Sequence, residues 1–376
     1  MRKRNLWGVP VVLSVLLLFS CEDVSVSVNK KGQVAMTRSE GVFVYDPASG
    51  RVSLIDWNYG NPGIPVIVRW SPDGESLAFT VRSASGSQDA SVYIVKKDGS
   101  GKKLLHEAAK IVSQMEWSPD GRWLSIATAG EDSDMSVADL GILSVADGEW
   151  RDVAKNTGDV HAWTDPKTVA FVKLSEKNPD NGDLFKGQLV TRNVDTGKER
   201  ILTPLIAGKS SEVRSRPGSD EILFTAIEAS EEKPEFTKDM ASDPYVYRIR
   251  PGEPAQWISD RVVTFIGYSP NGKKVLIKSK GEDGVDLALL DPDTTESTVL
   301  VPMIPDTVNV SQVDVKVIPA WLDDGAVLFW KQVNVYGSGG QALRLMSRDI
   351  STGKTANHQV AIDTAVDKLV QSKGGY

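Results

Sequence analysis

One four-residue pattern recurs along the chain and constrains its fold more than any other feature. "WSPDG" stands at residues 70–74 and again at 117–121, and "YSPNG" follows at 268–272. In such a tetrad proline presets φ, Asp or Asn accepts local hydrogen bonds, and glycine adopts the positive φ that reverses the chain. A run of apolar residues follows each copy, as in a buried strand. The pattern therefore predicts a tight turn between two β-strands.

Weaker copies of the tetrad fill the intervals between the clear ones. They read "NKKG" at 29–32, "TDPK" at 164–167, "RPGS" at 216–219 and "LDDG" at 322–325. All copies together recur at intervals of about 49 residues, and a fixed period of this size is typical of propellers and solenoids. Each copy also holds a second turn rich in Asp and Gly, which implies four strands per unit. We therefore predict one all-β domain over residues 26–360, followed by a C-terminal tail at 361–376. The domain is expected to be a seven-bladed β-propeller of four-stranded antiparallel blades, with six blades as the alternative.

The tetrad, the strand after it and the second turn together resemble the WD-repeat-like propeller repeat of the TolB family and of the propeller domain of prolyl oligopeptidases. The resemblance runs through residues 26–360 and is clearest in the second, third and sixth copies. It implies the fold and leaves the activity open. TolB proteins carry an α/β domain ahead of the propeller that engages the Tol-Pal machinery, whereas here only residues 22–25 separate Cys21 from the first repeat.

An aromatic residue precedes the first turn in most repeats. These residues are Trp70, Trp117, Trp163, Tyr268 and Trp321. One interpretation is a set of rings that stack on a ligand. We prefer the other, in which a residue that recurs once per repeat fills the space between adjacent sheets, because a buried aromatic covers about 150 to 250 Å².

The N-terminus has the pattern of an export signal. "MRKR" is a positive n-region, and the apolar run that follows is too short for a membrane-spanning helix. Cys21, the single cysteine, directly follows this run in "LFSC". The placement resembles the lipobox of bacterial lipoproteins, which implies a signal peptide at 1–20, a lipidated N-terminus at 21–25 and a location in the bacterial cell envelope, on the extracytoplasmic side of a membrane. The alternative is a signal peptide that happens to contain a buried cysteine.

Net charge argues against one class of partner. Removal of residues 1–20 takes away Arg2, Lys3 and Arg4 and changes the formal net charge from −7 to −10. An anionic protein repels phosphate backbones, so we expect no nucleic-acid partner.

The negative charge gathers in the loops that join the second strand to the third in repeats 2 to 6. These loops hold 17 Asp and Glu against 6 Lys and Arg. In a propeller such loops share one face, which suggests a basic envelope protein or a cationic ligand as partner. The alternative is solvated charge that keeps long loops soluble. The residues we assign to partner binding are Glu131, Asp132, Asp134, Asp180, Asp183, Glu231, Glu232 and Glu235.

Catalytic and metal signals are weak. No G-x-S-x-G motif occurs, and the three histidines, His106, His161 and His358, lack ligand spacing. "NPDNGD" at 178–183 resembles part of a calcium loop but lacks the flanking Asp and distal Glu of the full motif, which favours an ordinary turn. We therefore expect no cofactor, no metal and no catalytic residue, and a membrane-anchored propeller that binds another envelope protein. The alternative is a propeller enzyme, a glycoside hydrolase, lyase or peptide-processing enzyme, that acts on an extracellular polymer.

The lipid anchor is testable with one substitution. Acyl chains contribute about 0.8 kcal/mol per buried methylene, so a lipidated Cys21 would hold the protein on a membrane. We expect Cys21→Ser to release the protein from the membrane fraction or to leave its signal uncut, as measured by fractionation and by the mass of the N-terminal peptide. Normal processing together with unchanged membrane retention would contradict the lipoprotein interpretation.

Overall fold

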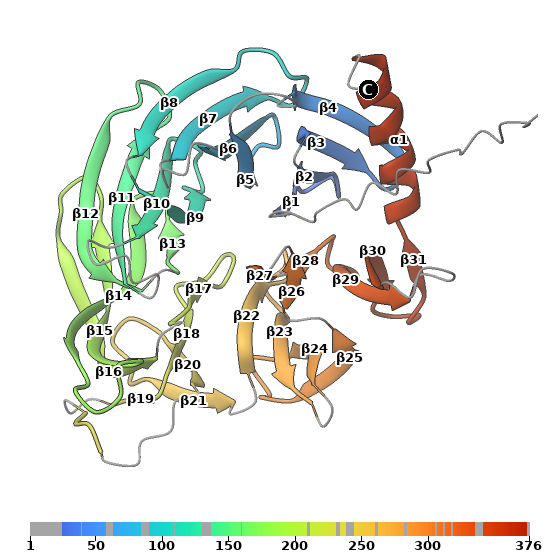
Figure 1. Ribbon diagram of the computed structural model, residues 1–376. Coiled ribbons are helices and arrows are strands. Elements are labelled where there is room, and N and C mark those ends of the chain that lie inside the picture. The colour runs from blue at the N-terminus through green and yellow to red at the C-terminus, as the bar shows by residue number, and fades with distance from the viewer. Residues whose placement is uncertain are drawn as a thin grey trace, which may run out of the picture.

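The protein is an all-β β-propeller, in which twisted antiparallel sheets surround a central axis (Figure 1). The structure is a computed structural model that describes residues 25–373 with short gaps. The gaps are residues 39, 58–62, 84–89, 109, 130–136, 159, 209–210, 231–233, 238–243, 260–261, 282–283, 305–306, 311–312, 317–318 and 335–340. Within the described residues, no helix is long and apolar enough to cross a membrane.

Five sheets have four antiparallel strands each, ordered from the centre of the ring outwards (Figure 1). Their strands are β1 (Val26–Val28), β2 (Val34–Arg38), β3 (Gly41–Asp46) and β4 (Arg51–Trp57); β5 (Ile64–Trp70), β6 (Ser76–Arg82), β7 (Ala90–Lys96) and β8 (Lys103–Ala108); β17 (Val213–Ser215), β18 (Ile222–Ala226), β20 (Tyr245–Ile249) and β21 (Gln256–Ser259); β22 (Val262–Tyr268), β23 (Val275–Lys280), β24 (Val285–Leu290) and β25 (Ser297–Ile304); β28 (Ala320–Trp321), β29 (Ala326–Asn334), β30 (Gln341–Asp349) and β31 (Thr355–Asn357).

A further sheet has nine strands, which come from the third and fourth sequence repeats except for β19 from the fifth. Its strands are β9 (Val112–Trp117), β10 (Trp123–Ala129), β11 (Ala138–Ser144), β12 (Trp150–Thr157), β13 (Ala162–Asp165), β14 (Thr168–Lys177), β15 (Leu184–Asn193), β16 (Glu199–Gly208) and β19 (Glu228–Ala229). A hairpin of β26 (Thr307–Val310) and β27 (Val313–Lys316) stands apart from the larger sheets.

The expected number of blades is therefore wrong. The structure has five four-stranded blades, not seven and not six. The third and fourth repeats do not close into separate sheets, because Thr157 at the end of β12 pairs with Lys173 of β14. β14, β15 and β16 are ten residues long, and of the three only β14 pairs with the edge of β12. The sequence period shows how many times the turn recurs, but it does not show which strands pair at their edges.

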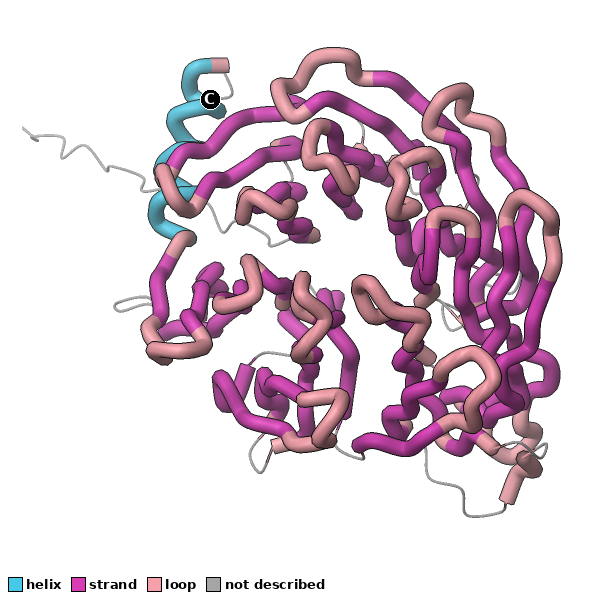
Figure 2. The backbone as a smooth tube through the Cα atoms, turned by 180° about the vertical axis from the view of Figure 1, so that it is seen from behind, coloured by secondary structure: helices cyan, strands magenta, loops and turns pink. Residues whose placement is uncertain are grey.

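The tetrads form the predicted turns, and the serine organises them. In the turn at 71–74, the Ser71 hydroxyl donates to the Asp73 carboxylate at 2.6 Å and accepts from the Ser76 backbone N–H at 2.9 Å. Gly74 has φ +71° and donates its N–H to the Ser71 carbonyl. Ser118 and Ser269 make the same bonds in their turns. Figure 2, the view from behind, shows these short turns around the ring.

The recurring aromatic residues link each repeat to the one before it. The Trp117 indole donates to the Arg69 carbonyl at 3.2 Å, and the Trp321 indole donates to the Gly267 carbonyl at 2.9 Å. Trp163 donates to the Ser125 hydroxyl at 2.8 Å. Trp70 is also buried, although its indole N–H has no partner in the described part of the chain. These contacts lie between neighbouring repeats, as the packing interpretation predicts.

Glycine in the second turn brings neighbouring repeats into close contact. Gly148 has φ +80°, and a Cβ built on it would lie 2.6 Å from the Leu105 carbonyl oxygen in β8. Gly99, one repeat earlier, has φ +83° and meets the Ile55 carbonyl oxygen of β4 at 2.9 Å. Both positions therefore require glycine for two reasons. A residue with a Cβ is strained at a positive φ, and its Cβ would also collide with the carbonyl oxygen of the neighbouring repeat.

A C-terminal helix joins the first and last sheets. The helix α1 (Gln359–Ser372) begins before the expected tail at 361–376, and its apolar stripe is Ile362, Val366 and Val370. These residues pack in one cluster with buried side chains of β2, β3, β29 and β30. The His358 ring bonds the Tyr45 hydroxyl at 2.9 Å and the Ser347 hydroxyl at 2.8 Å. Among the described residues no strand passes between these two sheets, so side-chain packing closes the ring there (Figure 1).

The second-turn contact gives a stability test with a matched control. Gly50 has φ +70° in the corresponding turn of the first repeat, and nothing lies within 4 Å of a Cβ built there. A left-handed backbone costs a residue other than glycine about 1 to 2 kcal/mol. We expect Gly50→Ala to lower the free energy of unfolding by that amount and Gly148→Ala to lower it further, because the backbone of β8 must also move. Chemical denaturation of both variants measures the difference, and equal losses would show that the Leu105 contact contributes nothing.

Candidate functional site

The strands of the fourth repeat extend into a projecting lobe. We call residues 174–187, 227–230 and 234–237 the acidic lobe. It contains the ends of β14 and β15, the turn between them, and β19. β19 derives from the fifth repeat but pairs with β16 of the fourth, with Leu205 opposite Ala229 and Ile206 opposite Glu228. The loops of these two repeats therefore form one structure.

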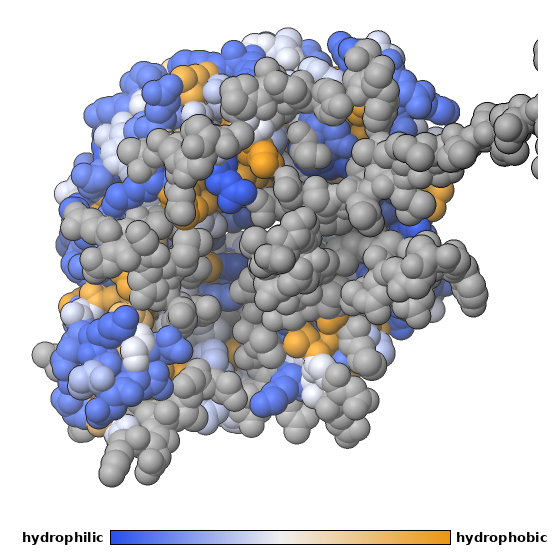
Figure 3. All heavy atoms as spheres, viewed as in Figure 1, coloured by the Kyte–Doolittle hydropathy of each residue, from blue (hydrophilic) through white to orange (hydrophobic). Residues whose placement is uncertain are grey.

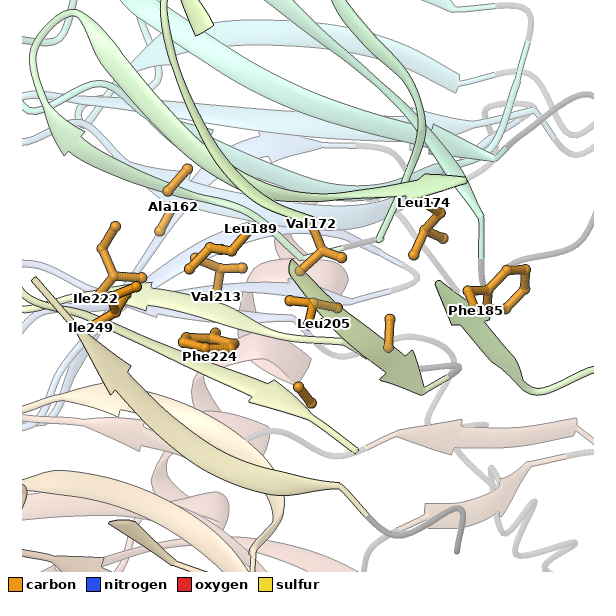
Figure 4. Packing of buried hydrophobic residues seen from close by; sticks show 13 residues of the cluster. Ala162, Val172, Leu174, Phe185, Leu189, Leu205, Val213, Ile222, Phe224 and Ile249 are labelled. Atoms are coloured by element: carbon orange, nitrogen blue, oxygen red, sulfur yellow. The ribbon is translucent and has the colours of Figure 1, made fainter. Parts of the chain in front are cut away.

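A small core supports the lobe. Leu184, Ile206 and Ile227 are buried together, and Phe236 packs against them. The Ile227 backbone N–H donates to the Ile206 carbonyl at 2.8 Å. Next to it lies the larger core between the fourth and fifth repeats, which Figure 4 shows from close by. The lobe is thus a packed extension of the propeller.

The turn at 178–183 is a hydrogen-bonded turn. The buried Asn178 side-chain oxygen accepts from the backbone N–H groups of Asp180 at 2.9 Å and Asn181 at 3.2 Å. The Asn181 side chain in turn accepts from the Asp183 N–H at 3.1 Å. The two amide oxygens that a calcium loop would aim at a cation therefore bind backbone N–H groups. No cluster of three or more His, Cys, Asp or Glu able to hold a metal is found among the described residues.

Two lysines lie among the acids of the lobe. The Lys186 ammonium lies 2.6 Å from the Glu235 carboxylate and 3.4 Å from that of Glu176, and 5.2 Å from the ring centre of Phe236. The hydrogen bond to Glu235 raises the pKa of Lys186, so the ammonium stays charged. Lys177 lies over the Phe185 ring. The lobe surface is hydrophilic, as the lower left of Figure 3 shows over the ends of β15, β16 and β19.

The structure places three of the expected partner-binding residues. Asp180 and Asp183 are exposed on one turn, and Glu235 is exposed beside Lys186 in the same lobe. The other residues lie outside the described part of the chain: Cys21, Glu131, Asp132, Asp134, Glu231 and Glu232. Sequence reasoning missed Glu176, Lys186 and the pairing of β19, because that pairing joins segments of different repeats.

The histidines lie apart and have structural contacts. The His106 ring stacks on Trp150 at 4.8 Å, and His358 begins α1. His161 is buried with its Nε2 2.6 Å from the Ser125 hydroxyl, a distance that also suits a nucleophile and its base. Ser125, however, is fully buried and also accepts from the Trp163 indole. Burial lowers the pKa of His161 to about 3, so its ring is neutral near pH 7 and the pair serves packing.

The most deeply buried carboxylate also serves the fold. Glu221 lies 2.8 Å from the Arg250 guanidinium and 3.2 Å from that of Arg216, and accepts from the Tyr268 hydroxyl at 3.1 Å. Arg216 also forms a two-bond pair with Asp293 of the next repeat. A buried carboxylate needs such partners because desolvation is costly. At position 268 the repeat thus has tyrosine in place of tryptophan, and its hydroxyl binds the Glu221 carboxylate of the preceding repeat.

Carboxylates also lie on the innermost strands. The Glu116 carboxylate of β9 lies 3.2 Å from the Arg69 guanidinium of β5. The buried Glu212, which directly precedes β17, lies 3.9 Å from Arg214 on that strand. Each of these two acids is next to an arginine, and such pairs neutralise each other's charge.

Known structures share this architecture. Crystalline TolB from Acinetobacter baumannii is similar with a TM-score of 0.50 and 12% identity, over 89% of this chain and 78% of that one. The β-propeller domain of the Trilobed protease from Pyrococcus furiosus, described as having an open velcro topology, has a TM-score of 0.60 and 14% identity over 90% and 96% of the two chains. An oligogalacturonate lyase in complex with manganese has a TM-score of 0.60 and 13% identity over 86% and 90%.

No protein-family model matches the sequence. At such low identities the likeness extends to the fold alone, which proteins of unrelated function share. The chain therefore has the β-propeller architecture seen in TolB and in several enzymes.

Proposed function

We propose that the protein is a membrane-anchored, non-enzymatic propeller that binds another cell-envelope protein through its acidic loop face. The observation that carries the proposal is the acidic lobe, a packed extension that presents Asp180, Asp183 and Glu235 to solvent. Rigid scaffolds that display polar loops in this way are common binding surfaces. A partner with a basic surface would be attracted to it over a screening length of about 8 Å at physiological ionic strength.

The envelope location rests on the N-terminal sequence. The apolar run and the Cys21 that follows it support export and lipidation. Both lie outside the described residues, and fractionation of Cys21→Ser tests them independently of any partner.

A propeller enzyme acting on an extracellular polymer remains the alternative. The likeness to an oligogalacturonate lyase supports it at the level of fold. Such an enzyme would hold carboxylates together, partly buried, at the mouth of the channel. Asp180, Asp183 and Glu235 instead lie exposed on the lobe, and Glu116 and Glu212 at the inner strands each lie beside an arginine, which favours the binding function.

Charge removal on the lobe tests the proposal. We expect the triple variant Asp180→Asn, Asp183→Asn and Glu235→Gln to capture at least several-fold less partner from detergent-solubilised envelopes, as measured by quantitative mass spectrometry. Capture by the wild-type protein should fall as salt rises, because screened charges attract less. Thermal stability should stay nearly unchanged, because exposed ion pairs contribute about 0 to 1 kcal/mol.

A second triple variant serves as the matched control. Asp195→Asn, Glu253→Gln and Glu296→Gln remove the same charge from exposed second turns at the other end of the sheets. One of its residues, Asp195, is paired with Lys167 at 2.8 Å, as Glu235 is with Lys186. Equal losses of capture in both triples would indicate a general charge effect. If the lobe triple variant captures as much partner as the wild-type protein and salt has no effect on capture, the lobe is only a solubilising surface.

A further inference from the structure

Lysines gather in the turns of the first two repeats, on the face of the ring that carries the tetrads. The second turn of repeat 2 reads "KKDGSGKK" at 96–103, and the tetrad of repeat 1 adds two further lysines. First and second turns share one end of each antiparallel sheet. All six lysines are exposed, and we call them the lysine patch: Lys30, Lys31, Lys96, Lys97, Lys102 and Lys103.

Contacts between repeats show that the patch is one surface. The Glu75 carboxylate lies 3.7 Å from the Lys31 ammonium of repeat 1 and 2.7 Å from the Lys97 ammonium of repeat 2. The Lys102 ammonium lies 2.8 Å from the Asp56 carboxylate of repeat 1. The patch therefore continues across the junction of the two repeats.

The patch is positive in a protein whose net charge is negative. Its six lysines have four carboxylates near them, those of Asp56, Asp73, Glu75 and Asp98. Among the described residues, three of the lysines form no ion pair with a carboxylate: Lys30, Lys96 and Lys103. Lys103 donates to the neutral Ala146 carbonyl at 3.0 Å. The patch therefore keeps an excess of positive charge.

The chain enters the ring between the two repeats that carry the patch. The Ser25 N–H donates to the Thr37 hydroxyl of repeat 1 at 3.0 Å, and the Ser25 hydroxyl accepts from the Val68 N–H of repeat 2 at 3.3 Å. The tetrad at 29–32 begins four residues further on, about 13 Å along an extended strand. The four residues from Cys21 to Ser25 span at most about 14 Å. A lipid on Cys21 can therefore reach the tetrad face, and it holds the bilayer close to the ring.

We propose that the lysine patch binds the anionic headgroups of the membrane in which Cys21 is anchored, so that the tetrad face of repeats 1 and 2 rests on the bilayer. The inference rests on the lipid anchor of the proposed function. The short tether lets either face approach the bilayer, so the charge of the faces selects between them. An anionic lipid surface attracts lysines and repels carboxylates. The acidic lobe lies at the opposite end of the sheets and is left accessible to its partner.

Three single-cysteine labels measure which face touches the lipid. The native thiol is blocked by its lipid, so a fluorophore can be attached at Ser100→Cys in the second turn of repeat 2, at Thr196→Cys in the equivalent turn of repeat 4, or at Ser175→Cys on the lobe. All three residues are exposed and uncharged. The lipidated full-length protein is reconstituted in vesicles whose headgroups carry a quencher. The lipid is phosphatidylcholine alone, or phosphatidylcholine partly replaced by phosphatidylglycerol.

We expect phosphatidylglycerol to make quenching at position 100 at least several-fold stronger than at positions 175 and 196, because the anionic lipid attracts the patch to the surface. The contrast between positions should fall as salt rises, because screened charges attract less. The same contrast in phosphatidylcholine alone, no contrast in either lipid, or stronger quenching at position 175 would each overturn the inference.

Two triple variants test whether the patch lysines cause the contrast. The patch triple changes the three lysines that form no ion pair, so no carboxylate loses a partner: Lys30→Gln, Lys96→Gln and Lys103→Gln. The control triple removes the same charge from exposed turns of the same face in repeats 4, 6 and 7: Lys198→Gln, Lys273→Gln and Lys354→Gln. Only the patch triple should abolish the contrast. Equal losses in both triples, or a contrast that survives the patch triple, would overturn the assignment to the patch.

Failure of the anchor is distinguishable from failure of the inference. The mass of the N-terminal peptide shows whether Cys21 carries acyl chains before the vesicles are made. An unmodified Cys21 overturns both the anchor and the inference, whereas an acylated Cys21 without the contrast overturns the inference alone. Capture by the lobe triple variant is measured in detergent and does not depend on either result.

Discussion

The contact between an aromatic side chain of one repeat and the inner strand of the repeat before it is the interaction on which the ring depends. Trp117 bonds the Arg69 carbonyl, and Trp321 bonds that of Gly267. A sheet with two apolar faces cannot bury both faces by itself. Every sheet of the ring must therefore stack on the sheets on either side of it. The indole fills the gap and also satisfies a backbone carbonyl, which fixes the relative height of neighbouring sheets.

Where a repeat departs from the regular pattern, a different interaction connects it to the neighbouring repeat. Tyr268 replaces tryptophan and bonds the buried Glu221, which two arginines neutralise. At the closure of the ring the first and last sheets share α1 and its apolar stripe. In the third and fourth repeats, which contain the long strands β14, β15 and β16, the pairing of Thr157 with Lys173 joins sheets that stay separate in the other repeats. Each departure replaces one kind of inter-repeat contact with another.

The acidic lobe arises from the same long strands. Because β15 and β16 continue past the body of the propeller, a segment of the next repeat can add to their edge as β19. A small apolar core then forms beneath Phe236, and the acids around it are displayed on a structured surface. The two candidate catalytic arrangements, the Ser125 and His161 pair and the Glu221 cluster, are instead engaged in packing. In the described part of the chain, Asp180, Asp183 and Glu235 are exposed on the lobe.

The sequence alone was sufficient for the turns, the strands, the propeller class and the packing role of the aromatic residues. These features depend on local backbone angles and on periodicity, which are visible in "WSPDG" and in the apolar run after it. It also showed that acidic residues gather in one set of loops. The number of separate sheets, the pairing of β19 with β16, the place of Lys186 between two carboxylates and the helical closure were decided only by the tertiary structure. Each depends on which strand edges and side chains meet across repeats, and no pattern within one repeat carries that information.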